Sequence, residues 1–117
     1  MKKRTVTDPR VNAVAQRVLK AAEDALGNKL DKVILYGSYA RDDYDSESDI
    51  DFFILADVPQ EEASARRRDI RKLLPGIDLE YDIPVSLHVT GSTVFNRYVD
   101  SLPYYMNVVR EGVVLGE

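Results

Sequence analysis

Residues 33–55 constrain the fold more than any other part of the chain. They read VILYGSYARDDYDSESDIDFFIL: an apolar run, a Gly-Ser pair, a polar turn, and then Asp49-Ile50-Asp51 at the head of a second apolar run. Both apolar runs have the length and the residue types of buried strands. Because successive side chains of a strand point to opposite faces, Asp49 and Asp51 are predicted to share one face. The segment therefore predicts two strands, with a glycine turn before a pair of carboxylates.

The paired carboxylates predict a metal site. Two neighbouring carboxylates on one face repel each other unless a cation lies between them. Mg²⁺ in particular is commonly held by one or two carboxylates together with the phosphates of a substrate. The chain has no cysteine, which excludes disulfides, thiolate zinc sites and cysteine nucleophiles. We therefore expect Asp49 and Asp51 to bind Mg²⁺ and a phosphate to lie at the turn of Gly37 and Ser38.

The rest of the chain alternates predicted helices with short strands. The first helix is predicted to start at Thr7-Asp8-Pro9, where a side-chain oxygen caps free amides, and to end at Gly27. Further helices are predicted at residues 59–74, 93–99 and 103–111, and strands at residues 32–36, 49–56, 83–90 and 113–115. This order predicts an α/β (α+β) fold, with a small mixed β-sheet flanked by helices.

Length and composition predict one soluble domain. The chain has 117 residues, so residues 1–117 are expected to form a single domain around a modest core. No apolar stretch approaches the roughly 20 residues of a membrane helix, and the basic start is not followed by the apolar segment of a secretory signal. A cytoplasmic location is therefore expected. The net charge of -4 argues against broad electrostatic binding to duplex nucleic acid.

Gly37-Ser38, ten intervening residues and Asp49-Ile50-Asp51 resemble the motif of the nucleotidyltransferase superfamily of DNA polymerase beta. The fuller string GSYAR…SDIDFFIL is similar to the minimal nucleotidyltransferases, which are small stand-alone domains often encoded beside a helical HEPN-type ribonuclease toxin. The closing segment SLPYYMNVVREGVVL extends the similarity over nearly all of the chain. The resemblance implies the nucleotidyltransferase fold and an antitoxin-like enzyme that transfers AMP from ATP, with Mg²⁺, to a hydroxyl of a partner protein.

The resemblance also assigns roles to individual residues. Asp49 and Asp51 are expected to be the catalytic metal ligands. Gly37 lets the backbone approach a phosphate, and Ser38 can donate its hydroxyl to the β- or γ-phosphate. Arg41 is expected either to bind phosphate or to hold the loop through one of the aspartates that follow it (Asp42, Asp43 or Asp45). Ser48 is expected to help bind the nucleotide by orienting Asp49.

The third strand departs from the family pattern. Active members carry a third carboxylate on the strand that corresponds to residues 83–90, but the aligned position here is Ser86. A neutral hydroxyl cannot replace a carboxylate as a base or metal ligand. Asp82 shares the parity of Ser86 but lies about 13 Å earlier along an ideal strand. A bend at Pro84 could let Asp82 or Glu80 reach inward. The alternative function is therefore a catalytically weakened domain that serves as a binding module for a helical HEPN-type partner.

Other residues have a structural and a functional interpretation. His88 is either a half-buried strand histidine or a proton relay on the face of Ser86. Tyr104 and Tyr105 either pack their helix or dock a partner. The basic residues of the predicted helix at 59–74 form either a solvated face or a surface for RNA or an acidic partner; they are Arg66, Arg67, Arg68, Arg71 and Lys72.

Overall fold

The computed structural model describes residues 8–116, and its first element is the helix α1 (Pro9–Leu26). Asp8 caps this helix: its Oδ1 accepts hydrogen bonds from the amides of Arg10 at 2.9 Å and Val11 at 3.4 Å. The helix ends at Gly27, which has a φ of 56° and donates its N–H to Glu23 O. Both predicted ends of the first helix are confirmed, although Thr7 lies outside the described residues.

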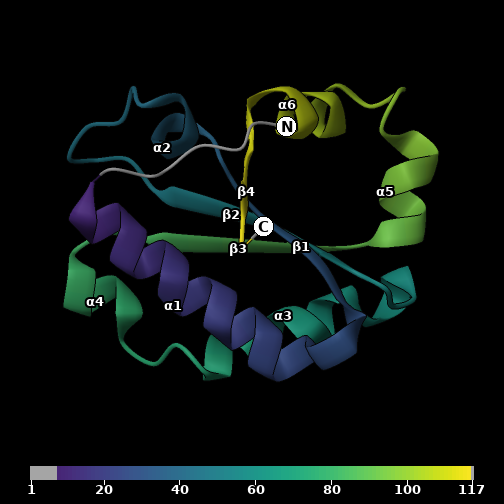
Figure 1. Ribbon diagram of the computed structural model, residues 1–117, viewed down its shortest axis with the longest axis horizontal. Coiled ribbons are helices and arrows are strands. Elements are labelled where there is room, and N and C mark those ends of the chain that lie inside the picture. Colours follow the sequence, from purple (N-terminus) through teal and green to yellow (C-terminus); the bar gives the residue numbers. More distant parts are fainter. Residues whose placement is uncertain (1–7, 117) are drawn as a thin grey trace.

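A four-stranded mixed sheet forms the centre of the molecule (Figure 1). Its strands are β1 (Leu30–Tyr36), β2 (Ile50–Ala56), β3 (Val85–Gly91) and β4 (Val113–Leu115), in the order β3-β2-β1-β4. β1 is antiparallel to β2 and β4, whereas β2 and β3 are parallel. The predicted mixed sheet is confirmed, and the pairing makes β2 a central strand and β3 an edge strand.

The lower face of the sheet in Figure 1 packs against α1, α3 (Ala63–Lys72) and α4 (Ile77–Tyr81). The larger hydrophobic core lies here, and its members include Val14, Val18, Leu35, Phe52 and Ile54. Each fully buried side chain of this size contributes roughly 1.5–3 kcal/mol. The helix predicted for residues 59–74 is divided into a 3₁₀ turn (Gln60–Glu62) followed by α3. No pattern in the sequence indicated α4.

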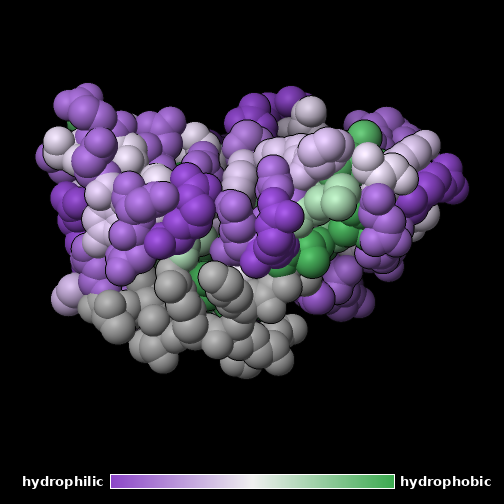
Figure 2. Space-filling model, turned by 90° about the horizontal axis from the view of Figure 1, so that it is seen from above, coloured by the Kyte–Doolittle hydropathy of each residue, from purple (hydrophilic) through white to green (hydrophobic). Residues whose placement is uncertain are grey.

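The upper face carries the short helix α2 (Ser38–Arg41) and the helices α5 (Ser92–Tyr98) and α6 (Pro103–Glu111). A smaller core lies below α5 and α6, and its buried members are Ile34, Phe53, Leu55, Phe95 and Val108. Seen from above, polar residues cover most of this face, and apolar residues show in a hollow between α6 and α5 (Figure 2). No helix within residues 8–116 has the length and apolar character needed to cross a membrane.

Candidate active site

The turn after β1 lies directly against Asp51. In the antiparallel pairing of β1 with β2, Tyr36 is the partner of Asp51, so the next residue, Gly37, lies beside the carboxylate. Gly37 has a φ of 78°, a conformation that other residues rarely adopt. A Cβ at this position would lie 2.7 Å from Asp51 Oδ2, closer than real Cβ contacts. Glycine is therefore required here both for the backbone conformation and for the space beside Asp51.

The hydrogen bonds of α2 hold the Gly-Ser turn. The amide of Arg41 donates to Gly37 O at 3.1 Å, and the amide of Asp43 donates to Ser38 O at 3.1 Å. Asp42 ends the helix in the left-handed conformation, with a φ of 66°. Within the described residues the Ser38 hydroxyl has no hydrogen-bond partner, so it remains available to a ligand.

Asp49 and Asp51 lie at the start of β2 but differ in burial. The predicted strand included Asp49, whereas β2 begins at Ile50, so Asp49 is an exposed residue just before the strand. Asp51 is half-buried, and burial raises the pKa of its carboxyl. The charge of Asp49 raises this pKa further, whereas His88 and Arg41 act in the opposite direction. Among residues 8–116, no side chain forms a hydrogen bond or ion pair with the Asp51 carboxylate.

The two carboxylates could form part of a metal site. Within residues 8–116, no three or more His, Cys, Asp or Glu side chains are grouped so that they alone could hold a metal ion. A divalent cation would therefore be held by Asp49 and Asp51 together with phosphate and water oxygens, which is a common arrangement for Mg²⁺. The half-buried and unpaired Asp51 carboxylate fits this arrangement, because a cation there would offset the unfavourable burial of its charge.

Arg41 holds the loop through Asp43 and a residue near the C-terminus. Its Nε donates to Asp43 Oδ2 at 3.1 Å, and its Nη1 donates to Glu111 Oε2 at 3.1 Å. Of the two predicted roles, the structure shows the loop contact with Asp43. Glu111 was not predicted, because no local pattern links residues 70 positions apart.

The hydroxyl of Ser48 closes the polar turn before β2. It accepts a hydrogen bond from the Asp45 amide at 3.1 Å and donates to Asp45 Oδ1 at 3.3 Å. The predicted contact with Asp49 is therefore replaced by a local contact with Asp45, of the kind that serine commonly makes in turns.

Ser86 occupies the position on β3 beside Asp51. The parallel pairing of β2 with β3 makes Ser86 the partner of Asp51, and paired residues project to the same face. Asp82 is exposed and lies before β3, at the end of α4, with a φ of 55°. Glu80 forms an ion pair with Arg17 of α1 at 3.1 Å, so its carboxylate is engaged on the opposite side of the sheet.

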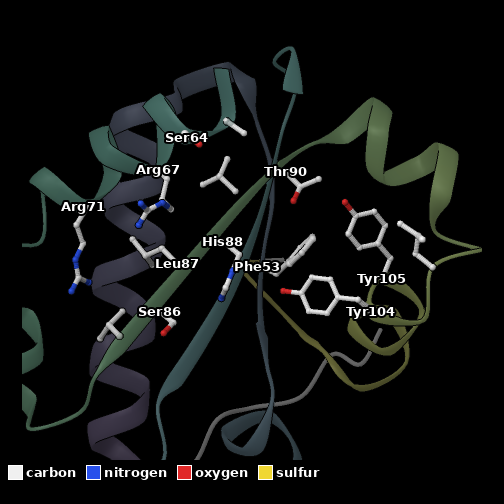
Figure 3. A pocket seen from close by; sticks show the side chains of 14 residues that line it. Phe53, Ser64, Arg67, Arg71, Ser86, Leu87, His88, Thr90, Tyr104 and Tyr105 are labelled. Atoms are coloured by element: carbon white, nitrogen blue, oxygen red, sulfur yellow. The ribbon is translucent and has the colours of Figure 1, made fainter. Parts of the chain in front are cut away.

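Tyr36, Tyr104 and His88 form an aromatic group next to Asp51. The hydroxyl oxygens of Tyr36 and Tyr104 lie 2.7 Å apart, and the rings of Tyr36 and His88 meet edge to face with centroids 5.9 Å apart. Burial strongly raises the pKa of the Tyr36 hydroxyl, which therefore stays protonated. Figure 3 shows His88 between Ser86 and Tyr104. Sequence reasoning missed Tyr36, although its place one residue before the Gly-Ser pair was a signal.

Comparison with known proteins gives three kinds of similarity. The sequence matches the nucleotidyltransferase domain family over residues 16–105. The "Putative protein adenylyltransferase MJ0141" of Methanocaldococcus jannaschii is 40% identical over 80 residues, which are 68% of this chain and 79% of that protein. The "Putative protein adenylyltransferase MJ0604" of the same organism is 33% identical over 104 residues, covering 86% of this chain and 96% of that protein.

Solved structures share the fold. A crystal structure of a toxin-antitoxin with AMP-PNP has a TM-score of 0.57 and 23% identity, covering 86% of this chain and 71% of that chain. A "putative nucleotidyltransferase from Sulfolobus solfataricus" has a TM-score of 0.52 and 18% identity, covering 95% of this chain and 89% of that chain. These similarities extend over most of each chain, so the two structures share the overall fold of this protein.

Proposed function

Because this chain belongs to the nucleotidyltransferase domain family, we propose that it transfers AMP from ATP to a hydroxyl of a partner protein in the cytoplasm, as an antitoxin-like enzyme. The two M. jannaschii proteins named as adenylyltransferases support this choice of nucleotide and acceptor. One structural observation carries the proposal. Gly37 is packed so closely on Asp51 that a phosphate bound at the turn would lie next to the paired carboxylates.

The proposed reaction makes and breaks one bond at the α-phosphorus of ATP. The acceptor hydroxyl oxygen attacks this phosphorus, the bond to the oxygen that bridges to the β-phosphate breaks, and pyrophosphate leaves. The hydroxyl proton passes to a base or to water. In the site, the turn at Gly37 would position the triphosphate and the Ser38 hydroxyl would donate to a phosphate oxygen. Asp49 and Asp51 would hold Mg²⁺, which supplies charge neutralisation at the attacking and leaving oxygens.

A second candidate function depends on whether the site has a base that accepts the proton of the acceptor hydroxyl. Ser86, and not a carboxylate, is the β3 partner of Asp51, and the carboxylate of Glu80 is paired elsewhere. His88 is the titratable side chain that β3 presents to the same face, and its charge acts on Asp51. Without an effective base, the domain would bind nucleotide and a helical HEPN-type partner but would transfer AMP slowly. The position of Ser86 is the observation that favours this second candidate.

The experiment that tests the proposal measures AMP transfer. The parent protein is incubated with ATP labelled at the α-phosphate, Mg²⁺ and the protein encoded by the neighbouring gene, and label in protein is followed. The same measurement is made on Ser86→Asp, which restores a carboxylate beside Asp51. Ser101→Asp is the matched control, because Ser101 is an exposed residue between α5 and α6 that does not line the cavity beside Ser86.

Each outcome distinguishes the two candidates. Label transferred by the parent, and lost with Asp51→Asn, supports the enzyme. Transfer by Ser86→Asp alone, with neither the parent nor Ser101→Asp active, supports the binding module and identifies one missing carboxylate. No transfer by any of these proteins, together with a stable complex and retained ATP binding, contradicts the enzyme.

A further inference from the structure

The backbone groups along the outer edge of β3 are only partly hydrogen-bonded. The amide of Ile50 donates to Pro84 O at 2.9 Å, which sets the alternation of the parallel ladder. The backbone groups of the even-numbered residues of β3 face β2, and those of the odd-numbered residues face away from the sheet. β3 is the last strand of the sheet on this side, so within residues 8–116 no strand pairs with these outward groups.

Side chains close the two ends of this edge and leave its middle open. At one end the amide of Val85 donates to Asp78 Oδ2 at 3.0 Å, and at the other the amide of Gly91 donates to Gln60 Oε1 at 2.8 Å. Between them, the amides of Leu87 and Val89 have no hydrogen-bond partner among the described residues. Exposed strand edges are usually protected or used for pairing.

A cavity of about 690 Å³ opens over the middle of this edge. One wall comes from α3, with Arg67 and Arg71, and the other comes from α6, with Tyr104 and Tyr105. Figure 3 shows these side chains on the two sides of β3, with Ser86 and His88 between them. The open backbone groups therefore lie at the floor of a groove that leads to the face of Asp51.

We propose that an extended segment of the acceptor protein binds in this groove and adds to the outer edge of β3 as a further strand. This inference rests on the function proposed above and names the way in which that site receives its protein substrate. Backbone hydrogen bonds to Leu87 and Val89 would give affinity without regard to sequence, and the two walls would select side chains.

The shape of the groove favours a single strand over a second copy of this chain. The side chains of α3 and α6 project on both sides of the edge, so only a narrow segment reaches β3. Edge-to-edge pairing of two copies would bring the α3 helices together and place the two Arg67 side chains in a common groove. Like charges at such a contact oppose association.

The positive charge of the α3 wall predicts acidic residues in the bound segment. Arg71 forms an ion pair with Asp78 at 2.6 Å, and Arg66 pairs with Glu62 at 3.5 Å. Arg67 is exposed and forms no ion pair within residues 8–116. Alternate residues of an added strand point to opposite faces, so those on the α3 side would meet Arg67, whereas those on the α6 side would meet the tyrosines.

The acceptor hydroxyl would come from the residues on the α6 side. An added strand would lie about 4.8 Å from β3 and so about 10 Å from β2, which carries Asp51. Ser86 lies between them and is small, so a long side chain can pass over it. A tyrosine, whose ring separates its hydroxyl from Cβ, reaches further across this gap than a serine. The predicted segment therefore has a tyrosine with acidic neighbours on both sides.

Synthetic peptides test the docking separately from the reaction. The probe is an acetylated and amidated peptide with the sequence Thr-Val-Glu-Tyr-Glu-Val-Thr, and its twin carries lysine in place of both glutamates. Binding to the full chain is measured by fluorescence anisotropy without nucleotide. Amide exchange is measured with and without the probe. We expect tighter binding of the acidic peptide and slower exchange at Leu87 and Val89.

Variants of the groove provide the matched controls. Arg67→Glu should weaken binding of the acidic peptide about fivefold or more and strengthen binding of its lysine twin, because the groove charge is reversed. Arg68→Glu makes the same charge change on α3 at an exposed residue outside the groove, and it should have little effect. Val89→Pro removes an outward N–H, which edge strands tolerate, and should abolish binding while the circular dichroism spectrum is retained.

The outcomes separate this inference from the proposed function. Equal binding of the two peptides, equal losses in Arg67→Glu and Arg68→Glu, or unchanged exchange at Leu87 and Val89 would overturn the docking inference even if the protein transfers AMP to its partner. Binding with the expected pattern, but without AMP transfer to the peptide or the partner, would leave the docking surface established and contradict the proposed reaction.

Discussion

The hydroxyl oxygens of Tyr36 and Tyr104 lie 2.7 Å apart and join the end of β1 to α6 beside Asp51. Both rings are also in edge-to-face contact, with centroids 6.1 Å apart. Helix α6 is thereby held over the half of the sheet that carries the candidate site. The two interpretations of Tyr104 are therefore compatible, because its ring packs the helix while its exposed side lines the groove beside β3.

Tyr104→Phe should lower the free energy of unfolding by about 1–2 kcal/mol, because it removes this hydrogen bond and leaves the half-buried Tyr36 hydroxyl without a partner. Tyr105→Phe is the matched control. The Tyr105 hydroxyl forms no hydrogen bond within residues 8–116, so its removal should change stability little. Urea unfolding of the three proteins makes the measurement. Equal stability losses in the two variants would show that the Tyr36 contact does not stabilise α6.

Nucleotide affinity should depend on both Mg²⁺ and the two aspartates. Because a cation at Asp49 and Asp51 would complete its coordination with phosphate oxygens, Asp51→Asn should weaken ATP binding in the presence of Mg²⁺ by about tenfold or more, a loss of about 1.4 kcal/mol. Asp57 is an exposed residue directly after β2, so Asp57→Asn removes an equal charge away from the site and should bind ATP as the parent does. Calorimetric titration with ATP, with and without Mg²⁺, distinguishes them. Equal affinity in both conditions would rule out the metal site.

Asp51→Asn should make the metal-free protein more stable at neutral pH. Burial raises the pKa of the Asp51 carboxyl in the folded protein. The protonated carboxyl therefore favours folding most at a pH below the pKa of the unfolded chain, and this contribution is lost as the pH rises through the pKa of the folded protein. Asp51→Asn removes a charge that is unfavourable to bury. The unfolding free energy of the variant should therefore exceed that of the parent at pH 7, and the difference should shrink as the solution is acidified below pH 4. Urea unfolding in the presence of a chelator tests this. A variant less stable than the parent at pH 7 would contradict it.

Substitution of two glycines with similar φ values distinguishes the cost of backbone strain from the cost of a steric clash. Gly27 and Gly37 have φ values of 56° and 78°, but a Cβ at Gly27 would meet nothing within 4 Å, whereas one at Gly37 would meet Asp51 Oδ2 at 2.7 Å. Gly27→Ala should cost about 1 kcal/mol through strain alone, and Gly37→Ala should cost about 2 kcal/mol or more.

ATP affinity should fall only in the variant whose new Cβ clashes with Asp51. Gly37→Ala displaces the Asp51 carboxylate and should lose nucleotide affinity, whereas Gly27→Ala should keep it. Thermal unfolding and calorimetric titration provide the two readouts. If Gly37→Ala binds ATP as tightly as Gly27→Ala does, the close approach of the turn to Asp51 is not needed for the ligand.

Local patterns were sufficient to predict most of the helices and strands and to show which site residues share a face of the sheet. The alternation of β3 placed Ser86 and His88 on one face, and the register with β2 confirms that this is the face of Asp51. The start of α6 at Pro103 was also predicted correctly, since proline favours the first turn of a helix. These features depend on residues that are close together in the sequence, so they can be predicted from one sequence.

Contacts between distant residues could not be predicted in this way. Tyr36 and Tyr104 are 68 positions apart, and Arg41 and Glu111 are 70 positions apart, so neither pair leaves a local pattern. The helix α4 was missed because its five residues are too few to show a helical period. Ser48 was assigned to Asp49, its neighbour in sequence, but the turn geometry directs its hydroxyl to Asp45.

The pairing of β1 with β4 has a consequence for the order of events during synthesis. Residues 33–35 of the second quarter of the chain pair with residues 113–115, and the loop that carries the Gly-Ser turn is tied to Glu111 by Arg41. A ribosome adds roughly 5–20 residues per second, so β1 and the turn wait several seconds for these partners to emerge. A nascent chain that is halted before residue 111 would hold both aspartates and the turn, yet would lack the contact of Arg41 with Glu111 and the pairing of β1 with β4. Full competence to bind nucleotide should therefore arrive only after residues 111–115 have left the ribosome.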